Sequence, residues 1–174
     1  MPRQFVLTLT AASRVGILAA VTKALDELGG NLHAMDQTVL QGYFTMILSA
    51  DFPEHRDPQV VIDHIRDIGR PWGIDVTLKD PEADQLSDTG EDTWICAVEF
   101  FGPDRPGLLR QMASRFALEG ISIIELHGRR NEEDDEVNMK LELAVPDSCS
   151  PDVVYNFIQD LQESTQLQTR IHPV

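Results

Sequence analysis

Hydrophobic and polar positions change their period in the same order twice along the chain. Residues 5–9 and 95–101 are rich in apolar residues and predict strands, the second of them buried on both faces. Apolar residues then recur every three or four positions, as on one face of a helix. They are Ile17, Leu18, Val21, Leu25 and Leu28 in the first copy and Leu108, Leu109, Met112 and Phe116 in the second. Each predicted helix ends at a glycine, within 28–31 and 118–121, which suits a C-cap.

Two further strands, a second helix and a last strand follow in each copy. The two strands meet at Gln41-Gly42 in the first copy, a tight hairpin signal, whereas the acidic segment 131–135 supplies a longer turn in the second. Pro58 and Pro151 fit the first turn of the second helix. The apolar faces of these helices are Val61, His64, Ile65 and Ile68, and Val154, Phe157, Ile158 and Leu161, and the closing strands are 74–79 and 167–172.

Matching residues at a constant separation show that the chain contains an internal repeat. Gly16 aligns with Gly107, 91 positions later, and Gly29 aligns with Gly120 at the same distance. Beyond the hairpin the separation becomes 93, because the second turn is two residues longer. The identities at this separation include Met46 and Met139, Leu48 and Leu141, Pro53 and Pro146, Pro58 and Pro151, Ile65 and Ile158, and Asp67 and Asp160.

The order β-α-β-β-α-β, found twice, is that of a ferredoxin-like fold. We therefore predict an α+β protein with two tandem domains, each a four-stranded antiparallel sheet with two helices on one face. The first domain covers residues 1–80 and the second covers 94–174. Residues 81–93 are acidic and almost free of large apolar side chains, which is the composition of a linker.

Charge and composition limit the classes of partner. The 174 residues include 14 basic and 29 acidic side chains, a formal net charge of −15. Nucleic-acid binding needs a basic stripe, but the only basic pair, Arg129-Arg130, is followed at once by an acidic run, so we expect no direct nucleic-acid binding. No apolar run reaches the roughly 18–20 residues of a membrane span, and the N-terminus lacks a signal peptide's apolar region. We expect a cytoplasmic protein in which Cys96 and Cys149 are reduced thiols.

The main candidate for a site follows the predicted strand, which breaks at Gly102. The segment Pro103-Asp-Arg-Pro-Gly107 leads into a helix, whose N-terminus has unpaired N–H groups and a positive dipole end that attract carboxylates and phosphates. Gly107 would let a ligand approach the backbone, and Asp104 could hold an ammonium group. The alternative is that Asp104 caps the helix and the prolines stiffen the turn.

The same loop differs in the first copy. Residues 11–16 have Ser13 in place of the acid and Val15 in place of the proline. At the start of the next strand the first copy has Asn31, whose amide both donates and accepts hydrogen bonds, and the second copy has Ser122. The better loop and the better strand-start residue therefore lie in different copies. We expect them to cooperate in one asymmetric site across a domain interface.

Other reactive side chains do not form a catalytic pattern. The five histidines lack ligand-like spacing, although His33 and His127 lie near strand starts where they could border a ligand site. The acidic run 132–136 lacks the spacing of a calcium-binding loop and is typical of a solvated hairpin. We find no nucleophile motif, P-loop, zinc spacing or dinucleotide fingerprint, and we expect a binding protein that needs no metal or cofactor.

The strand, the Asp104-Arg-Pro-Gly-Leu-Leu motif, the helix and Gly120-x-x-Ile resemble an ACT domain, a small regulatory ligand-binding module. Two such domains with this linker, and the first hairpin at 36–49, resemble the glycine cleavage system transcriptional repressor family. The resemblance implies domains that pair edge to edge and bind amino acids at their interfaces. The implied ligand-binding residues are Asp104, Arg105, Pro106, Gly107 and Leu108, with Gly16 and Asn31 from the first copy.

The resemblance further implies a homodimeric, non-enzymatic regulator that binds an amino acid such as glycine or serine. It would act on a protein partner in the control of glycine cleavage. One alternative is a scaffolding dimer with decayed ligand sites, which the altered first loop favours. Another is an enzyme fragment, since formyltetrahydrofolate deformylases carry ACT modules attached to catalytic domains. Against it, the chain ends at Val174, soon after the last predicted strand.

Overall fold

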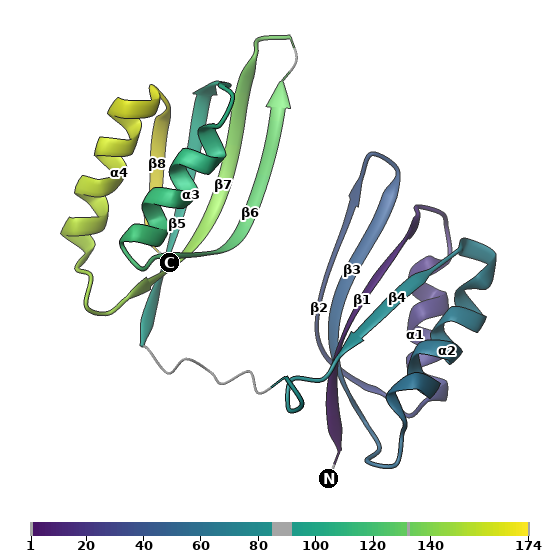
Figure 1. Cartoon of the computed structure of the whole chain (residues 1–174). Helices are drawn as coiled ribbons and strands as arrows, with labels where there is room; N and C mark the ends of the chain where they lie inside the picture. The colour runs from purple at the N-terminus through teal and green to yellow at the C-terminus, as the bar shows by residue number, and fades with distance from the viewer. Residues whose placement is uncertain (1, 85–91, 132, 174) are drawn as a thin grey trace. The chain divides into compact units, whose positions relative to one another are not determined.

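The computed structural model of the chain describes residues 2–84, 92–131 and 133–173. The main chain divides into two compact units, Met1–Asp88 and Thr89–Val174, and Figure 1 shows a sheet with two helices in each. Residues 81–84 form a turn, and the rest of the predicted linker falls mainly on residues 85–91, outside the described part. None of the helices among the described residues combines the length and the apolar character that a membrane crossing requires.

The first domain is a four-stranded antiparallel sheet with strand order β2-β3-β1-β4. Both helices cover one face of the sheet (Figure 1). The elements are β1 Arg3–Ala12, α1 Ile17–Glu27, β2 Asn31–Leu40, β3 Tyr43–Phe52, α2 Pro58–Gly69, the short 3-10 helix η1 Arg70–Trp72, and β4 Asp75–Lys79. Gln41 and Gly42 join β2 to β3 with φ angles of 49° and 83°, both positive as a two-residue hairpin of type I′ requires.

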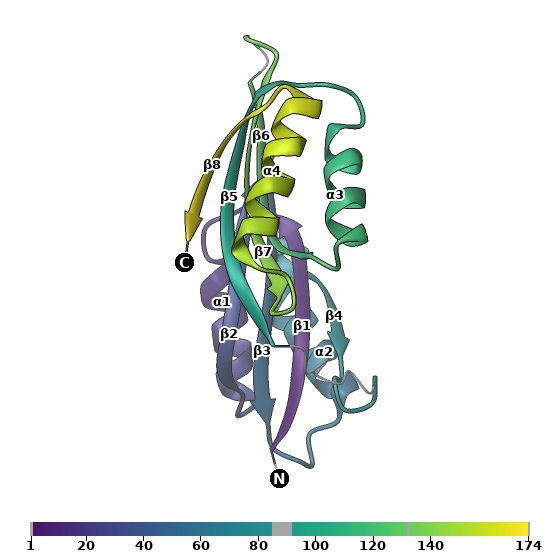
Figure 2. The same cartoon turned by 90° about the vertical axis from the view of Figure 1, so that its left-hand side faces the viewer.

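The second domain repeats this topology with strand order β6-β7-β5-β8. Figure 2 shows α3 and α4 on the same side of the sheet. The elements are β5 Thr93–Pro103, α3 Leu108–Leu118, β6 Ser122–Asn131, β7 Glu136–Pro146, α4 Pro151–Thr165 and β8 Gln168–Pro173. The prediction of two tandem ferredoxin-like domains is confirmed.

Each domain has its own hydrophobic core between the sheet and its helices. Alternate residues of the central strands point inward, and the helices add residues three or four positions apart. The first core includes Phe5, Leu7, Leu9, Val21, Leu25, Val61 and Ile65, and the second includes Val98, Phe100, Met112, Phe116, Ile158 and Leu161. Burial raises the pKa of the Cys96 thiol, and both Cys96 and half-buried Cys149 are free thiols, as expected.

Two details of the predicted strand 95–101 are wrong. The strand does not break at Gly102 but continues to Pro103, which pairs with Glu136. Gly102 has φ of 145°, a backbone conformation that residues with a side chain rarely adopt, so glycine lets the strand continue through this position. The strand is also buried on one face only, since Glu99 on the other face forms an ion pair with Lys140 at 2.8 Å.

Candidate functional site

The loop between β5 and α3 enters the helix through a glycine. Gly107 is the N-cap residue, with φ of 83° and ψ of 3°, and no side chain caps the helix there. A capping side chain must lie at the N-cap position itself, which glycine occupies. The alternative in which Asp104 caps α3 is therefore wrong.

Asp104 instead joins the loop to the β6–β7 hairpin. Its carboxylate lies 3.2 Å from Nε of Arg130, whose guanidinium also donates to the carboxylate of Asp135 at 2.6 Å. Its amide donates to the main-chain oxygen of Asp135 at 2.8 Å. The first domain has the matching bond, from the amide of Ser13 to the oxygen of Gly42 at 2.7 Å. The hairpin therefore holds the loop in both domains, and Asp104 already has a cationic partner.

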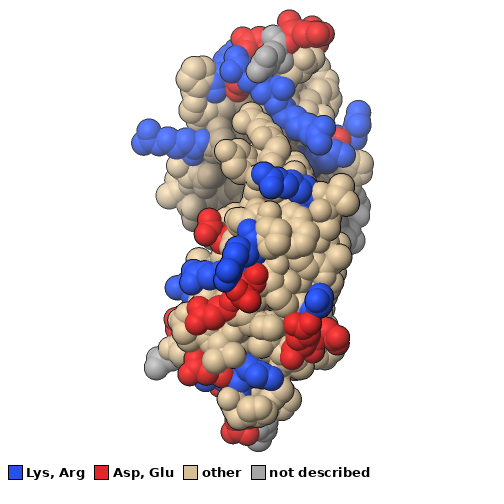
Figure 3. Space-filling view, turned by 90° about the vertical axis from the view of Figure 1, so that its right-hand side faces the viewer, with Lys and Arg blue, Asp and Glu red and all other residues tan. Residues whose placement is uncertain are grey.

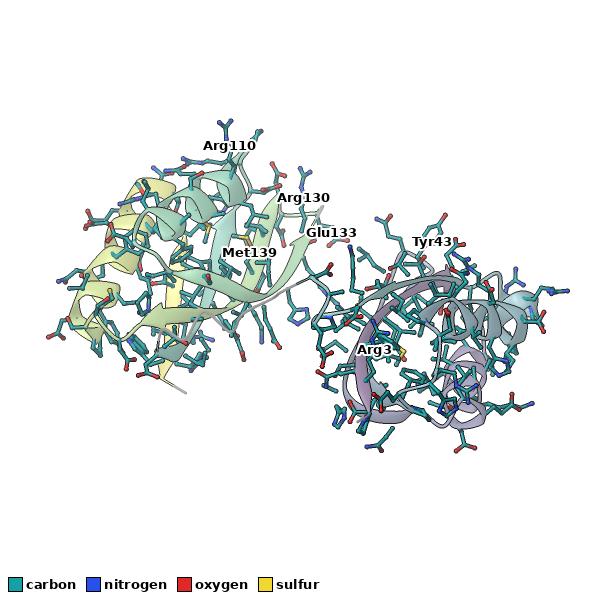
Figure 4. The ribbon with its side chains drawn as sticks, turned by 60° about the horizontal axis from the view of Figure 1, so that its bottom comes forward. Arg3, Tyr43, Arg110, Arg130, Glu133 and Met139 are labelled. Atoms are coloured by element: carbon teal, nitrogen blue, oxygen red, sulfur yellow. The ribbon has the colours of Figure 1, made fainter. Side chains whose placement is uncertain are left out.

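A cavity of about 650 Å³ lies between this loop, the start of α3 and the strands β6 and β7. Its apolar lining includes buried Met139 and half-buried Val137 of β7. In Figure 4, Arg110 lies on α3 and Arg130 near the tip of the β6–β7 hairpin, on either side of Met139. Five predicted residues line the cavity together: Asp104, Arg105, Pro106, Gly107 and Leu108.

The charge of the lining is opposite to that of the whole chain. Four arginines line the cavity, namely Arg105, Arg110, Arg129 and Arg130, together with two acids, Asp104 and Asp135. Figure 3 shows basic side chains gathered near the top of the view, below the acidic side chains at the hairpin tip. The sequence analysis identified the basic pair at 129–130 but set it aside because an acidic run follows it directly. It missed Arg110, which the fold brings from another element to the same cavity.

The first turn of α3 places main-chain donors beside the cavity. The amide of Leu108 donates to the oxygen of Arg105 at 3.1 Å, and the amide of Gln111 donates to the oxygen of Gly107 at 2.9 Å. In the described part of the chain, the amides of Leu109 and Arg110 have no hydrogen-bond acceptor. These donors and the positive end of the helix dipole can bind an anionic group of a ligand.

The corresponding loop of the first domain is covered by a side chain of its own domain. Gly16 has φ of 97°, close to that of Gly107. A Cβ atom at Gly16 would lie 3.0 Å from the indole of Trp72, and Nε1 of Trp72 donates to the oxygen of Val15 at 3.0 Å. A Cβ atom at Gly107 would meet no heavy atom within 4 Å. The two predicted glycines therefore have the same backbone conformation in different surroundings.

The remaining predicted residues lie outside this cavity. Asn31 is the exposed first residue of β2 in the first domain, and Ser122 begins β6. His33 forms an ion pair with Asp51 at 2.7 Å when protonated, and His127 lines a smaller cavity on the open face of the second sheet. Among the residues that the structure describes, no group of histidine, cysteine or acidic side chains could hold a metal ion.

In the acidic run, Glu132 lies outside the described residues. Beyond it, Asp134 accepts a hydrogen bond from Asn131 at 2.7 Å, and Asp135 pairs with Arg130. These carboxylates therefore stabilise the hairpin turn.

Two crystal structures have the same fold along the whole chain. An unknown protein from Galdieria sulphuraria superposes with a TM-score of 0.83 at 20% identity, covering 100% of this chain and 99% of that one. A protein described as a putative glycine cleavage system transcriptional repressor superposes with a TM-score of 0.71 at 15% identity, covering 100% and 98%. At these identities the likeness concerns the fold, which is a tandem ACT-like fold.

Sequence comparison gives relatives of single-domain length. No protein-family model matches the chain. A UPF0237 protein of Methanosarcina acetivorans is 31% identical over 77 residues, which are 44% of this chain and 84% of that protein. A UPF0237 protein of Corynebacterium glutamicum is 33% identical over 75 residues, 42% of this chain and 84% of that protein. Because these matches cover most of each relative, the chain belongs to the UPF0237 family.

Proposed function

We propose that this protein is a non-enzymatic regulator that binds an amino acid such as glycine or serine in the cavity beside α3. The observation that carries the proposal is an uncapped helix N-terminus that opens into a cavity next to Asp104. The carboxylate of the ligand would accept hydrogen bonds from the amides of Leu109 and Arg110. Its ammonium group would lie near Asp104. A carboxylate offers about four acceptor positions, so Asp104 can serve Arg130 and a ligand together.

The output that we propose is regulation of a protein partner in the control of glycine cleavage. The shared fold with the protein described as a putative glycine cleavage system transcriptional repressor supports this choice. The net charge of −15 favours a partner protein with a basic surface over nucleic acid. We also propose a homodimer in which exposed edge strands pair, because β2 and β6 are edge strands of their sheets. The contribution of Gly16 and Asn31 stays a prediction, and the proposal invokes neither metal nor cofactor.

A thermal-shift screen against the twenty amino acids tests ligand binding. A ligand at a hundred times its dissociation constant stabilises the folded state by about 2.7 kcal/mol, which raises the melting temperature by about 5–10 °C. In Gly107→Ala the shift should disappear, because the methyl group stands where the ligand approaches the backbone. The matched variant Gly16→Ala tests the predicted contribution of the first loop: a ligand-induced shift that persists there confines the ligand to the second domain, and a weakened shift assigns Gly16 to the site.

Other results would contradict the proposal. A shift that survives Gly107→Ala but disappears in Gly16→Ala would place the ligand in the first domain. The absence of any shift with all twenty amino acids would favour the scaffolding dimer instead. The covered loop at Gly16 is the specific observation that supports this second candidate, since it shows that one of the two loops has a structural role.

A further inference from the structure

A second cavity of the second domain, of about 210 Å³, lies between the start of β5, the start of α4 and the edge strand β8. Cys96 and Val154 of its lining are buried, and Tyr155 is partly exposed. The seven lining residues that the structure describes carry no charge: Trp94, Ile95, Cys96, Pro151, Val154, Tyr155 and Ile171. Figure 1 shows the start of β5 at the end of the domain away from the β6–β7 hairpin, so this cavity is separate from the cavity beside α3.

In the first domain an aromatic ring occupies the corresponding place. Cys96 aligns with Phe5 at the separation of 91 residues. The strand registers agree with this alignment, because Phe5 pairs with Ala50 and Cys96 pairs with Leu143, 93 positions after Ala50. Phe5 is fully buried, and its ring lies 5.8 Å from the ring of Phe52. The second copy of the repeat therefore has a small thiol where the first copy has a ring inside its core.

The exchange of Phe5 for Cys96 leaves space on one side of β5 only. Leu143 of β7 stands where the first domain has the smaller Ala50, and among the described residues it is not part of the lining. Because β5 lies between β7 and β8, Leu143 fills the core on the β7 side. The volume of the missing ring is therefore left on the side of β8 and α4, where the cavity lies.

The ion pair that covers the ring in the first domain has no counterpart in the second. There the guanidinium group of Arg3 lies 5.1 Å from the centroid of the Phe5 ring and donates to the carboxylate of Asp80. The second domain has Trp94 and Pro173 at these two positions, which carry no charge. Nε1 of Trp94 donates to the main-chain oxygen of Cys149 at 3.1 Å, which fixes the indole as one wall of the cavity.

We propose that this cavity binds an uncharged aromatic molecule of one ring, which takes the place that the ring of Phe5 has in the first domain. The inference does not depend on the proposed function. A cavity lined by apolar side chains stays dry and binds small apolar molecules, and a free cysteine packs as a small hydrophobe. A ring beside the Trp94 indole can adopt the offset or edge-to-face arrangement that aromatic pairs prefer.

Two-dimensional ¹H–¹⁵N NMR of the full chain, titrated with toluene, tests the proposal. We expect saturable shifts of the amides of residues 94–96 and 152–155, with a dissociation constant of about 1 mM for a ligand of about seven heavy atoms. Benzoate has the same ring with a carboxylate and should bind at least roughly tenfold more weakly, because the lining offers no partner for a charge. Equal binding of toluene and benzoate overturns the inference, and so does the absence of saturable shifts.

The first domain supplies the variant that should close the cavity. Cys96→Phe/Leu143→Ala introduces the pair that Phe5 and Ala50 form in the first domain, so the volume of the pair is conserved. Toluene should no longer shift the amides of residues 94–96. Circular dichroism without ligand verifies folding, and if the double variant does not fold, the smaller change Cys96→Leu should weaken toluene binding. Unchanged binding in either folded variant overturns the inference.

The control Gly107→Ala changes the cavity beside α3 and should leave toluene binding as it is. Shifts that disappear in this variant would place the ring beside α3 and overturn the inference. Shifts centred on the first hairpin, where Leu40 and Tyr43 are exposed, would show general contact with apolar surface and overturn it as well.

Discussion

The two loops that precede α1 and α3 have one backbone geometry and two environments. Gly16 and Gly107 both enter the helix with positive φ angles, 97° and 83°. The loop at Gly16 lies under the indole of Trp72, whereas the loop at Gly107 opens into a cavity. The difference shows that a side chain from outside the loop decides whether the helix N-terminus is covered or open to a cavity.

The two domains differ in the residue that lies at the end of their second helix. In the first domain α2 ends at Gly69, and the 3-10 helix Arg70–Trp72 carries the indole to the loop. In the second domain, Thr165 occupies the position of Trp72, at a separation of 93 residues. There α4 continues to Thr165, whose hydroxyl donates to the oxygen of Leu161 at 2.6 Å. The Thr165 side chain therefore forms its hydrogen bond within the last turn of α4 and does not cover Gly107.

Replacing Trp72, whose indole covers the loop at Gly16, should have the largest effect on the stability of the first domain. Trp72→Ala loses the packing of a large, half-buried ring and the hydrogen bond to Val15, so we expect the first domain to lose about 3 kcal/mol. Urea unfolding followed by circular dichroism measures the loss. The fluorescence of Trp94, in the second domain, should show an unchanged midpoint in the same samples. A loss below about 1 kcal/mol would mean that the indole does not hold the loop.

Adding a methyl group to each glycine should separate the two environments. Gly107→Ala should cost about 1–2 kcal/mol from the left-handed backbone alone. Gly16→Ala should cost about 1 kcal/mol more, because its Cβ would press on Trp72 at 3.0 Å. Urea unfolding of each variant measures both costs.

A double variant isolates the contact between Gly16 and Trp72. In a Trp72→Ala background, Gly16→Ala should cost no more than Gly107→Ala does in the wild type, since the ring is gone. Equal costs for the two glycines in the wild type would instead show that the indole yields freely.

A smaller effect should distinguish the open faces of the two sheets. Glu99 pairs with Lys140 across the second sheet, where the first sheet has Thr8 opposite Ile47. The hydrogen bond from Lys140 lowers the pKa of Glu99 below its ordinary value of 4.5. A lowered pKa stabilises the fold above pH 4.5, and this contribution is lost as the pH falls through the pKa of the folded state.

In Glu99→Gln the stability of the second domain should therefore depend less on pH below 4.5 than in the wild type. Urea midpoints from Trp94 fluorescence between neutral and acidic pH measure this dependence. The first domain can be followed by Trp72 fluorescence in a Trp94→Phe background. Its urea midpoints should depend on pH in the same way with and without the Glu99→Gln change. An unaltered slope in the second domain would mean that the Lys140 contact does not persist in solution.

Much of the fold could be predicted because local signals agreed in both copies. The glycines at 16 and 107, the Gln41-Gly42 turn and the two prolines that begin α2 and α4 each specify a conformation that their neighbours also favour. The end of β5 was misplaced, because Gly102 is compatible with a turn as well as with an extended strand. The strand extends to Pro103 because Gly102 and Pro103 pair with Val137 and Glu136 of β7, which are distant in sequence.

The candidate site could be predicted only in part. The Asp104–Leu108 loop was found because its residues are contiguous. Arg110 was missed, since a helix and a hairpin bring it and Arg130 to the lining of one cavity only after the chain folds. The covering role of Trp72 had no local signal, because it depends on where α2 ends and on a contact across 56 residues with Gly16.

In both domains the loop is tied by one hydrogen bond to the last residue of a hairpin turn, Gly42 or Asp135. The turns differ by two residues, yet the strand pairs that flank them, Leu40 with Tyr43 and Asn131 with Glu136, are equivalent. Insertions at the hairpin tip can therefore leave the loop in place as long as its last residue keeps that bond. A difference in turn length between two proteins of this fold is consequently no argument that their ligands differ.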